Sequence, residues 1–534
     1  MDNPLPEQSP PSTSAGRNSR RLDLLYVALV IAISGMLLLA AAQQKSFWED
    51  EVFTAIFSQV SEVAQGQGLS WDVHPPLYLF LANRWGQVFG FDELGLRSLS
   101  ILFTLAALAL SYKLALDTLD ETAALACVTL LAFSPLVIMY GHNARYYSLA
   151  AALALCVALM VVWFERTLNW VFLAGYIAAG VTFFYLLFGA ASVLIAANLW
   201  FLARWALASF GRRQSASQAA APSQGALKRW AGLAGWLLAQ AAVLALAWPA
   251  VQRALAASQR GGDAQATSGL LVESIKRIAY FGFTFTLGET LSPFNPLAWL
   301  GGLAAAGTLL FALWAWRKNA GLWLHVGFFA VIFAINFALT FQGAVAETWQ
   351  NLTYRIFFAL PFLAAWLGAG LARLRPRLAL LAGGLILAAY ALGIFNYFTG
   401  REFIRPSLAI NWPRIFNQVQ TRAIPGAVVI CSYGDSACGY YSKRAGFGGF
   451  GPEKWNELSG NPPAELWWLQ TNLGRAEGFK NDQKRLLETI QQTYPQVQST
   501  GYARQDPGIR WLKQRGANQE DYEYRLILYH FSRP

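Results

Sequence analysis

Charged residues are scarce in this sequence, and cysteines are scarcer still. Asp, Glu, Lys and Arg together make up 13% of the 534 residues, about half of the roughly 25% that is usual in a soluble domain. The four cysteines match neither the ligand spacing of a zinc site nor a framework of disulfides. The chain also lacks a nucleotide-binding loop, a dinucleotide fingerprint and a hydrolase nucleophile elbow. A single soluble domain and a disulfide-stapled mini-protein are therefore excluded.

Long apolar segments are present instead. Apolar side chains account for 55% of the residues, and a helix needs about 20 mostly apolar residues to cross a bilayer core. Eleven segments approach that length: residues 23–42, 97–116, 122–140, 146–164, 169–186, 188–205, 230–250, 297–316, 321–341, 354–372 and 378–397. The sequence therefore predicts an all-α polytopic membrane bundle of about 11 spans over residues 21–397.

The last quarter of the chain is more polar. Residues 400–534 carry 29 of the 71 charged side chains. Three short apolar runs alternate there with one helical pattern, at residues 427–431, 466–470, 524–531 and 482–494. Residues 398–534 are therefore expected to form a small soluble domain of the α/β or α+β type. Cys431 and Cys438 either form a disulfide in that domain or stay free.

The distribution of basic residues predicts the orientation of the chain in the membrane. With the N-terminus in the cytoplasm, 15 of the 24 basic residues within 1–399 fall on the cytoplasmic side. Residues 1–20, rich in Pro and Ser, then form a disordered cytoplasmic tail. Two outer loops, 43–96 and 251–296, face away from the cytoplasm together with the C-terminal domain. The expected location is the plasma (inner) membrane of the cell.

The densest acidic cluster, Glu49-Asp50-Glu51, follows the first apolar segment. A carboxylate can act as a general base on an acceptor hydroxyl, and neighbouring carboxylates can hold a divalent cation. The alternative is a charged flank that only ends a helix at the membrane surface. Local sequence leaves these interpretations open.

Several motifs stand in a characteristic order around this cluster. The segment Ser46-Phe47-Trp48-Glu49-Asp50-Glu51 precedes Asp72-Val73-His74-Pro75-Pro76-Leu77-Tyr78, followed by Asn143-Ala144-Arg145-Tyr146-Tyr147 and later by Tyr354-Arg355. This series resembles the polytopic glycosyltransferases related to the protein O-mannosyltransferases and to the aminoarabinose transferase of lipid A. These enzymes carry an Asp-Glu pair after the first span and a His-Pro-Pro-Leu-Tyr stretch before the second. The resemblance covers roughly residues 20–400 in architecture, and its specific motifs fall mostly in 46–149.

The resemblance implies a C-type glycosyltransferase fold, a polyprenyl-phosphate-linked sugar as donor, and catalysis at the outer membrane face. Asp50 matches the family's catalytic Asp, and Glu51 matches the neighbouring carboxylate that supports it. The acceptor hydroxyl loses its proton as it attacks the anomeric carbon, whereas the leaving lipid phosphate requires cationic stabilisation and no strong general acid. No cofactor is implied with certainty, and a divalent cation at Asp50 and Glu51 stays open.

Basic residues at predicted outer ends of spans are the candidates for binding the donor phosphate. They are Arg145, Arg355, Lys276 and Arg277. Arg offers a planar fork that matches phosphate oxygens, and the alternative for each residue is an anchor on lipid head groups. His74, Tyr146 and Tyr354 are expected to support the site.

The sequence thus favours an integral-membrane glycosyltransferase that moves a sugar from a polyprenyl phosphate to an envelope glycan, lipid or protein. The rivals are a polytopic transporter or lipid flippase with a soluble outer domain, and a non-catalytic assembly protein. A transporter usually places its polar groups at the bilayer midplane on broken helices, whereas this sequence concentrates them at one face. Nucleic acid is not an expected partner, because the net charge of +11 comes from residues that flank apolar spans.

Overall fold

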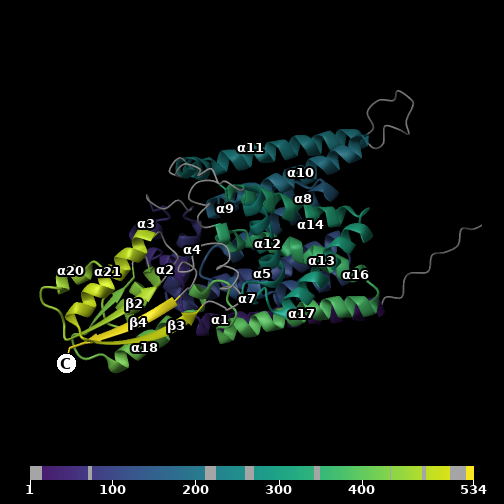
Figure 1. Ribbon diagram of the computed structural model, residues 1–534. Coiled ribbons are helices and arrows are strands. Elements are labelled where there is room, and N and C mark those ends of the chain that lie inside the picture. The colour runs from purple at the N-terminus through teal and green to yellow at the C-terminus, as the bar shows by residue number, and fades with distance from the viewer. Residues whose placement is uncertain are drawn as a thin grey trace, which may run out of the picture.

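The protein consists of a helical body with a smaller part of mixed helices and strands at one end (Figure 1). The structure is a computed structural model, and it describes residues 15–69, 75–210, 224–258, 270–341, 349–432, 435–471, 477–504 and 525–533. The helices of the body are α1 (Ala15–Gln44), α2 (Glu49–Phe57), α3 (Ser61–Ala64), α4 (Leu77–Phe89), α5 (Glu93–Thr118), α6 (Glu121–Ala132), α7 (Pro135–Tyr140), α8 (Tyr147–Thr167), α9 (Trp170–Leu186), α10 (Ala190–Phe210), α11 (Gln224–Ser258), α12 (Leu270–Leu287), α13 (Pro296–Ala315), α14 (Ala320–Leu339), α15 (Leu352–Arg355), α16 (Leu360–Arg373) and α17 (Pro376–Thr399), with 3₁₀ turns η3 (Trp349–Asn351), η4 (Phe357–Ala359) and η5 (Pro406–Ala409).

The helical body confirms the predicted membrane bundle. Within the described residues, eight helices are long and apolar enough to cross a membrane: α1, α5, α8, α10, α11, α13, α14 and α17. The other three predicted spans correspond to shorter apolar helices, which are α6, α9 and the segment Phe357–Arg373 that contains α16. Helix α1 begins at Ala15 and so includes the end of the predicted tail, whose residues 1–14 lie outside the described part of the chain.

Two of the predicted spans are interrupted near the end that the sequence predicts to be outer. The apolar segment 122–140 breaks after Ala132, and α7 starts at Pro135. Proline lacks a backbone N–H and disfavours helical geometry at the residue before it, here Ser134. The segment 354–372 likewise passes through a short 3₁₀ turn before α16 begins. These breaks lie next to the residues of the candidate site.

Close helix packing in the body depends on small residues. Helix α16 lies against α6, and a Cβ atom added at Gly368 would come within 2.5 Å of the Ala123 carbonyl oxygen. Glycine therefore permits this approach, as small residues do at helix contacts in membranes.

In the predicted first outer loop, 43–96, the described residues form three short helices, α2, α3 and α4, before α5 begins. Helix α4 is apolar, but its 13 residues are too few to span a bilayer. Figure 1 shows these helices at the end of the body that carries the strands. The first outer loop and the C-terminal part therefore share one end of the molecule.

The C-terminal part contains a four-stranded sheet. Its elements are α18 (Trp412–Arg422), β1 (Val428–Cys431), α19 (Ser436–Arg444), α20 (Lys454–Leu458), β2 (Glu465–Thr471), α21 (Glu477–Thr493), β3 (Gln496–Arg504) and β4 (Arg525–Ser532). The strand order is β1-β2-β4-β3, with β1 parallel to β2 and the other neighbours antiparallel. A disulfide joins Cys431 at the end of β1 to Cys438 in the first turn of α19.

Both faces of this sheet are buried. Ile430 and Trp468 face a core with Tyr494, next to α21, whereas Val429 and Trp467 join the core that continues into the helical body. This two-sided burial explains why the predicted strands read as continuous apolar runs.

Candidate functional site

Helix α2 places the acidic cluster at its first turn. Glu49, Asp50 and Glu51 are its first three residues, where acidic side chains are favoured by the helix dipole. Consecutive residues on a helix point in different directions. Glu51 is accordingly fully buried, whereas Asp50 is half-buried.

Glu51 forms a buried ion pair with Arg97 of α5. The Arg97 Nε donates to Glu51 Oε1 at 2.8 Å, and its Nη2 donates to Oε2 at 2.5 Å. The remaining Arg97 donors bind the carbonyl oxygens of Ala42, Lys45 and Ser46, so all five donors of the guanidinium are used. The pair therefore fastens α5 and the end of α1 to the start of α2.

The same carboxylate also fixes the turn before α8. The Ala144 N–H donates to Glu51 Oε1 at 2.8 Å, and the Trp48 N–H donates to Oε2 at 3.4 Å. Each Glu51 oxygen thus accepts two hydrogen bonds, which fills its lone-pair positions. Glu51 acts as a structural anchor for its neighbours.

Asp50 has different surroundings. The Tyr147 hydroxyl, on the first residue of α8, donates to Asp50 Oδ2 at 3.1 Å. Arg145 lies two residues earlier, close enough for the two charges to interact. Burial lowers the pKa of Arg145, but Asp50 and the neighbouring hydroxyls of Tyr146 and Tyr147 together outweigh it and raise that pKa. The guanidinium of Arg145 therefore stays charged at neutral pH.

Arg145 is buried but incompletely satisfied. Its Nη1 donates to Thr54 Oγ1 at 3.4 Å, and its Nε is a buried donor without a hydrogen-bond partner in the described part of the chain. Its guanidinium carbon lies 5.5 Å from the ring centroid of Phe53 and 5.4 Å from that of Tyr146. The Arg145 guanidinium is held in place, and its Nε can still donate a hydrogen bond to a further acceptor.

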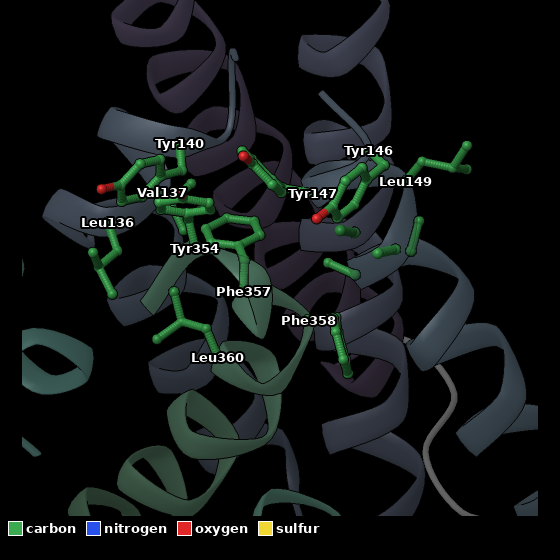
Figure 2. Close-up of a cluster of buried hydrophobic side chains, with 14 of the residues drawn as sticks. Leu136, Val137, Tyr140, Tyr146, Tyr147, Leu149, Tyr354, Phe357, Phe358 and Leu360 are labelled. Atoms are coloured by element: carbon green, nitrogen blue, oxygen red, sulfur yellow. The ribbon is translucent and has the colours of Figure 1, made fainter. Parts of the chain in front are cut away.

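Aromatic rings surround Asp50 and Arg145. Figure 2 shows Tyr140 of α7, Tyr147 of α8 and Tyr354 of α15 gathered together with Tyr146, the residue before α8. The Tyr354 ring centroid lies 5.2 Å from that of Tyr147 and 5.6 Å from that of Tyr140, and the Trp48 ring is 5.3 Å from Tyr354. These rings restrict the side chains around the polar groups and reduce their exposure to water.

A second buried ion pair lies beyond the rings. Glu289 is fully buried and accepts hydrogen bonds from the Tyr140 hydroxyl at 2.5 Å and the Tyr280 hydroxyl at 2.9 Å. Arg405, on the segment between α17 and α18, forms an ion pair with Glu289 at 2.7 Å and donates to Asn351 at 3.0 Å. This pair ties the segment that leads into the C-terminal part to the helical body.

The structure brings together only some of the predicted site residues. Asp50, Glu51, Arg145, Tyr146 and Tyr354 all lie in or beside this cluster, and Arg355 is half-buried next to Tyr354 at the end of α15.

The other predicted residues lie elsewhere or outside the described chain. Lys276 is exposed and pairs with Glu273 at 2.9 Å. Arg277 is buried and donates to the carbonyl oxygen of Thr340 at 2.5 Å, at the end of α14. His74 lies outside the described residues.

The residues present do not fit a divalent cation shared by Asp50 and Glu51. A cation would need free carboxylate oxygens, and both oxygens of Glu51 are occupied by N–H donors. Among the residues that the structure describes, no group of three or more His, Cys, Asp and Glu could hold a metal ion.

Sequence reasoning assigned no role to Tyr147, Arg97, Glu289 or Arg405. Tyr147 stands inside a motif that points to the site, so its adjacency to Arg145 was an available signal. Arg97 is a charged residue at the first position of a predicted span, where a charge is costly without a partner. Glu289 and Arg405 are 116 positions apart, and nothing in the local sequence connects them.

As a whole, the cluster combines a half-buried carboxylate, a hydroxyl that orients it and a cation with an unused donor. The carboxylate can accept a proton from an attacking hydroxyl. The cation can stabilise negative charge on a departing phosphate.

Comparisons with known proteins show what this chain is similar to. Residues 73–218 match the family described as dolichyl-phosphate-mannose-protein mannosyltransferase. The crystal structure of ArnT from Cupriavidus metallidurans in the apo state is similar over 94% of this chain and 97% of ArnT, with 13% sequence identity and a TM-score of 0.53. ArnT from Cupriavidus metallidurans bound to undecaprenyl phosphate is similar over 94% of this chain and 98% of that chain, with 14% identity and a TM-score of 0.50. No protein of curated function matches the sequence. The structural likeness shows the fold. These findings confirm the predicted resemblance and the predicted fold.

Proposed function

We propose that this chain transfers a sugar from a polyprenyl-phosphate donor to a hydroxyl group on a cell-envelope glycan, lipid or protein. The observation that supports this is the contrast within α2. Glu51 is fully engaged by N–H donors, whereas the half-buried Asp50 has Tyr147 and Arg145 beside it. Asp50 is the group that can still take part in chemistry.

In the proposed reaction, the acceptor oxygen attacks the anomeric carbon of the sugar, and its proton passes to Asp50. The bond between that carbon and the phosphate oxygen breaks, and its electron pair stays on the phosphate. Tyr147 orients Asp50 through its hydrogen bond of 3.1 Å. Arg145 stabilises the phosphate as its charge increases, which favours the transition state over the bound donor.

The remaining predicted residues take lesser roles in this proposal. Glu51 supports catalysis by holding α2 in place, and Arg355 assists at the phosphate beside Tyr354. Lys276 and Arg277 contact the lipid-linked donor or membrane head groups away from the reacting atoms. His74 precedes α4 and is proposed to support the loop that carries Asp50.

The orientation of the chain is part of the same proposal. The first outer loop and the C-terminal part lie at one end of the molecule (Figure 1), and the basic-residue distribution assigns that end to the outside of the plasma membrane. A membrane-impermeant thiol reagent should label cysteines engineered at Thr421 and Gln65 in intact cells, since both residues are on this end. Labelling only after permeabilisation would overturn the orientation.

The function is tested by comparing cells with and without the protein. Mass spectrometry of the envelope glycans, lipids and proteins should show one added sugar that disappears on deletion, while the matching polyprenyl-phosphate sugar accumulates. Complementation with the wild-type gene should restore the added sugar, and complementation with Asp50→Asn should not. Unchanged envelope composition and unchanged donor levels would contradict the proposal.

A further inference from the structure

A cavity of about 580 Å³ lies where the C-terminal part meets the helical body. Four segments line it: residues 42–46 at the end of α1, 92–94 at the start of α5, 411–420 on α18 and 441–445 at the end of α19. Its volume is within the range of about 300–1,000 Å³ that is usual for small-molecule sites. The cavity exists only because the two parts are joined here.

Specific contacts hold its walls together. The Tyr441 hydroxyl accepts a hydrogen bond from the Phe47 N–H at 2.7 Å and donates to Glu93 at 2.6 Å. Arg444 donates to both oxygens of Glu93, at 2.9 and 2.8 Å. The Ser46 hydroxyl donates to the carbonyl oxygen of Ile410 at 2.8 Å. The walls are thus fixed by groups from both parts of the chain.

The charges around the cavity are balanced. Lys45 and Arg444 carry positive charge, and Asp92 and Glu93 carry negative charge. Lys45 donates to the Tyr397 carbonyl oxygen at 2.6 Å and has no carboxylate at ion-pair distance among the described residues. Burial lowers the pKa of Lys45 to about 8, so it remains mostly protonated at neutral pH. A balanced set of charges favours a neutral ligand over a phosphate.

Free amide groups provide the hydrogen-bonding capacity. Gln43, Gln44 and Asn417 line the cavity, and their side chains make no hydrogen bond to the described part of the chain. Gln420 uses only its Nε2, which donates to Ala445 at 3.0 Å. An amide both donates and accepts, as the hydroxyl groups of a sugar do.

The cavity is also close to the proposed base. Ser46 lines it, and Asp50 follows four residues later, so their Cα atoms are at most about 14 Å apart. The wall is built from helix ends and offers no sheet edge to which a peptide could add as a strand. Asp50 does not line the cavity, so only a saccharide longer than one unit spans the distance between them.

We propose that this cavity binds a neutral saccharide segment of the acceptor, so that the acceptor is a glycan or glycolipid. This proposal rests on the proposed function, because it describes the second substrate of the same reaction. Lys45 and the free amides bind sugar hydroxyls, and the next unit of the saccharide presents its hydroxyl to Asp50.

Binding to immobilised probes tests the proposal without requiring turnover. Full-length protein in detergent is applied to neutral oligosaccharides of hexose, deoxyhexose and N-acetylhexosamine, to their phosphorylated counterparts, and to Ser/Thr peptides. Wild-type protein should retain a subset of the neutral oligosaccharides. Retention of the phosphorylated probes or peptides alone, or of no probe, would overturn the proposal.

A pair of matched variants tests whether the oligosaccharides bind in this cavity. Asn417→Trp fills the cavity and should reduce oligosaccharide retention at least tenfold, whereas Thr421→Trp, on the same helix but outside the lining, should leave it unchanged. If Asn417→Trp does not fold, Asn417→Ala replaces it, with about threefold weaker retention expected because one hydrogen-bonding group is lost. Equal retention by the folded Asn417 variant and the control would overturn the assignment.

The Asp50→Asn variant separates this inference from the proposed function. It should bind the same oligosaccharides as the wild type while losing transfer activity. Normal transfer by Asp50→Asn with intact saccharide binding contradicts the proposed base alone. Lost transfer without any saccharide binding by wild-type protein contradicts the cavity alone.

Discussion

Asp50 and Glu51 are neighbours on α2 and have opposite surroundings. Glu51 is fully buried, and its oxygens accept four hydrogen bonds from Arg97, Ala144 and Trp48. Asp50 is half-buried and accepts one hydrogen bond from Tyr147. The difference separates two uses of a carboxylate. A carboxylate whose oxygens are fully hydrogen-bonded maintains the geometry. A carboxylate that keeps free lone pairs beside a cation can react.

Arg405 and Arg145 show a similar contrast. Arg405 donates to Glu289 and Asn351 and joins distant segments. Arg145 makes one long hydrogen bond to Thr54 and has a buried Nε without a partner in the described residues. A buried donor without a partner is costly, and in the proposed function the phosphate of the sugar donor completes it. The donor phosphate has the required chemistry.

The largest expected effect is the loss of turnover in Asp50→Asn. This change keeps the size and removes the basic oxygen, so the rate should fall on the order of 100- to 10,000-fold. The measurement is the initial rate of sugar transfer in nanodiscs. Donor binding and thermal unfolding should stay close to those of the wild type. A near-normal rate would remove Asp50 from the mechanism.

The main effect of Glu51→Gln should be a lower free energy of unfolding. It leaves Arg97 buried without its counter-ion, and breaking a buried pair costs about 3–5 kcal/mol. Thermal unfolding in detergent should show a clear fall in the transition temperature, and the neighbouring change Glu49→Gln should cause a much smaller one. If Glu51→Gln unfolds like the wild type but is inactive, then Glu51 has a chemical role and the contrast with Asp50 fails.

Arg145→Lys should reduce the rate about 10- to 100-fold, because a single ammonium cannot reproduce the charged hydrogen bonds of a guanidinium fork. Arg145→Ala should be at least as damaging. The measurement is the initial rate against donor concentration for both variants. A residue that only anchors lipid head groups would tolerate lysine. Wild-type kinetics in both variants would transfer the phosphate role to Arg355.

Tyr147→Phe should lower the rate about three- to tenfold, corresponding to one hydrogen bond of about 0.5–1.5 kcal/mol. The ring remains, so its packing against Tyr354 at 5.2 Å is kept. The affinity for donor should change little, because the hydroxyl contacts Asp50 rather than the phosphate. The control is Tyr26→Phe, whose hydroxyl bonds to Thr129 at 2.8 Å at the other end of α1. Equal effects of the two changes would contradict an orienting role for Tyr147.

The sequence predicts much of the fold because apolar patterning is local. The eleven apolar segments and three of the four strands follow from runs of apolar residues, whereas helix α12 lies within the predicted loop 251–296. Strand β3 (Gln496–Arg504) escapes prediction because its residues are largely polar. The break before Pro135 is a local signal that a count of apolar residues overlooks.

The candidate site is predictable in part for a different reason. The motifs around Asp50 and Arg145 carry a family resemblance, so their convergence could be expected. The pairs Glu51–Arg97 and Glu289–Arg405 join residues 46 and 116 positions apart. Their pairing depends on how the helices pack, and no local sequence pattern predicts it. The sequence therefore indicates which carboxylates are present and not which of them is already satisfied.

The smallest expected effect is that of a chelator. A cation shared by Asp50 and Glu51 is an interpretation that the sequence allows, since hard cations prefer carboxylate oxygens. In the folded chain, N–H donors occupy both oxygens of Glu51, and Arg97 supplies the compensating positive charge. Transfer rates measured with and without EDTA, after removal of bound metal, should therefore agree within about twofold, a difference of only about 0.4 kcal/mol in activation free energy. A rate that collapses with EDTA and returns with added Mg²⁺ or Mn²⁺ would show that Glu51 is released from Arg97 during catalysis, and the distinction between the two carboxylates would no longer hold.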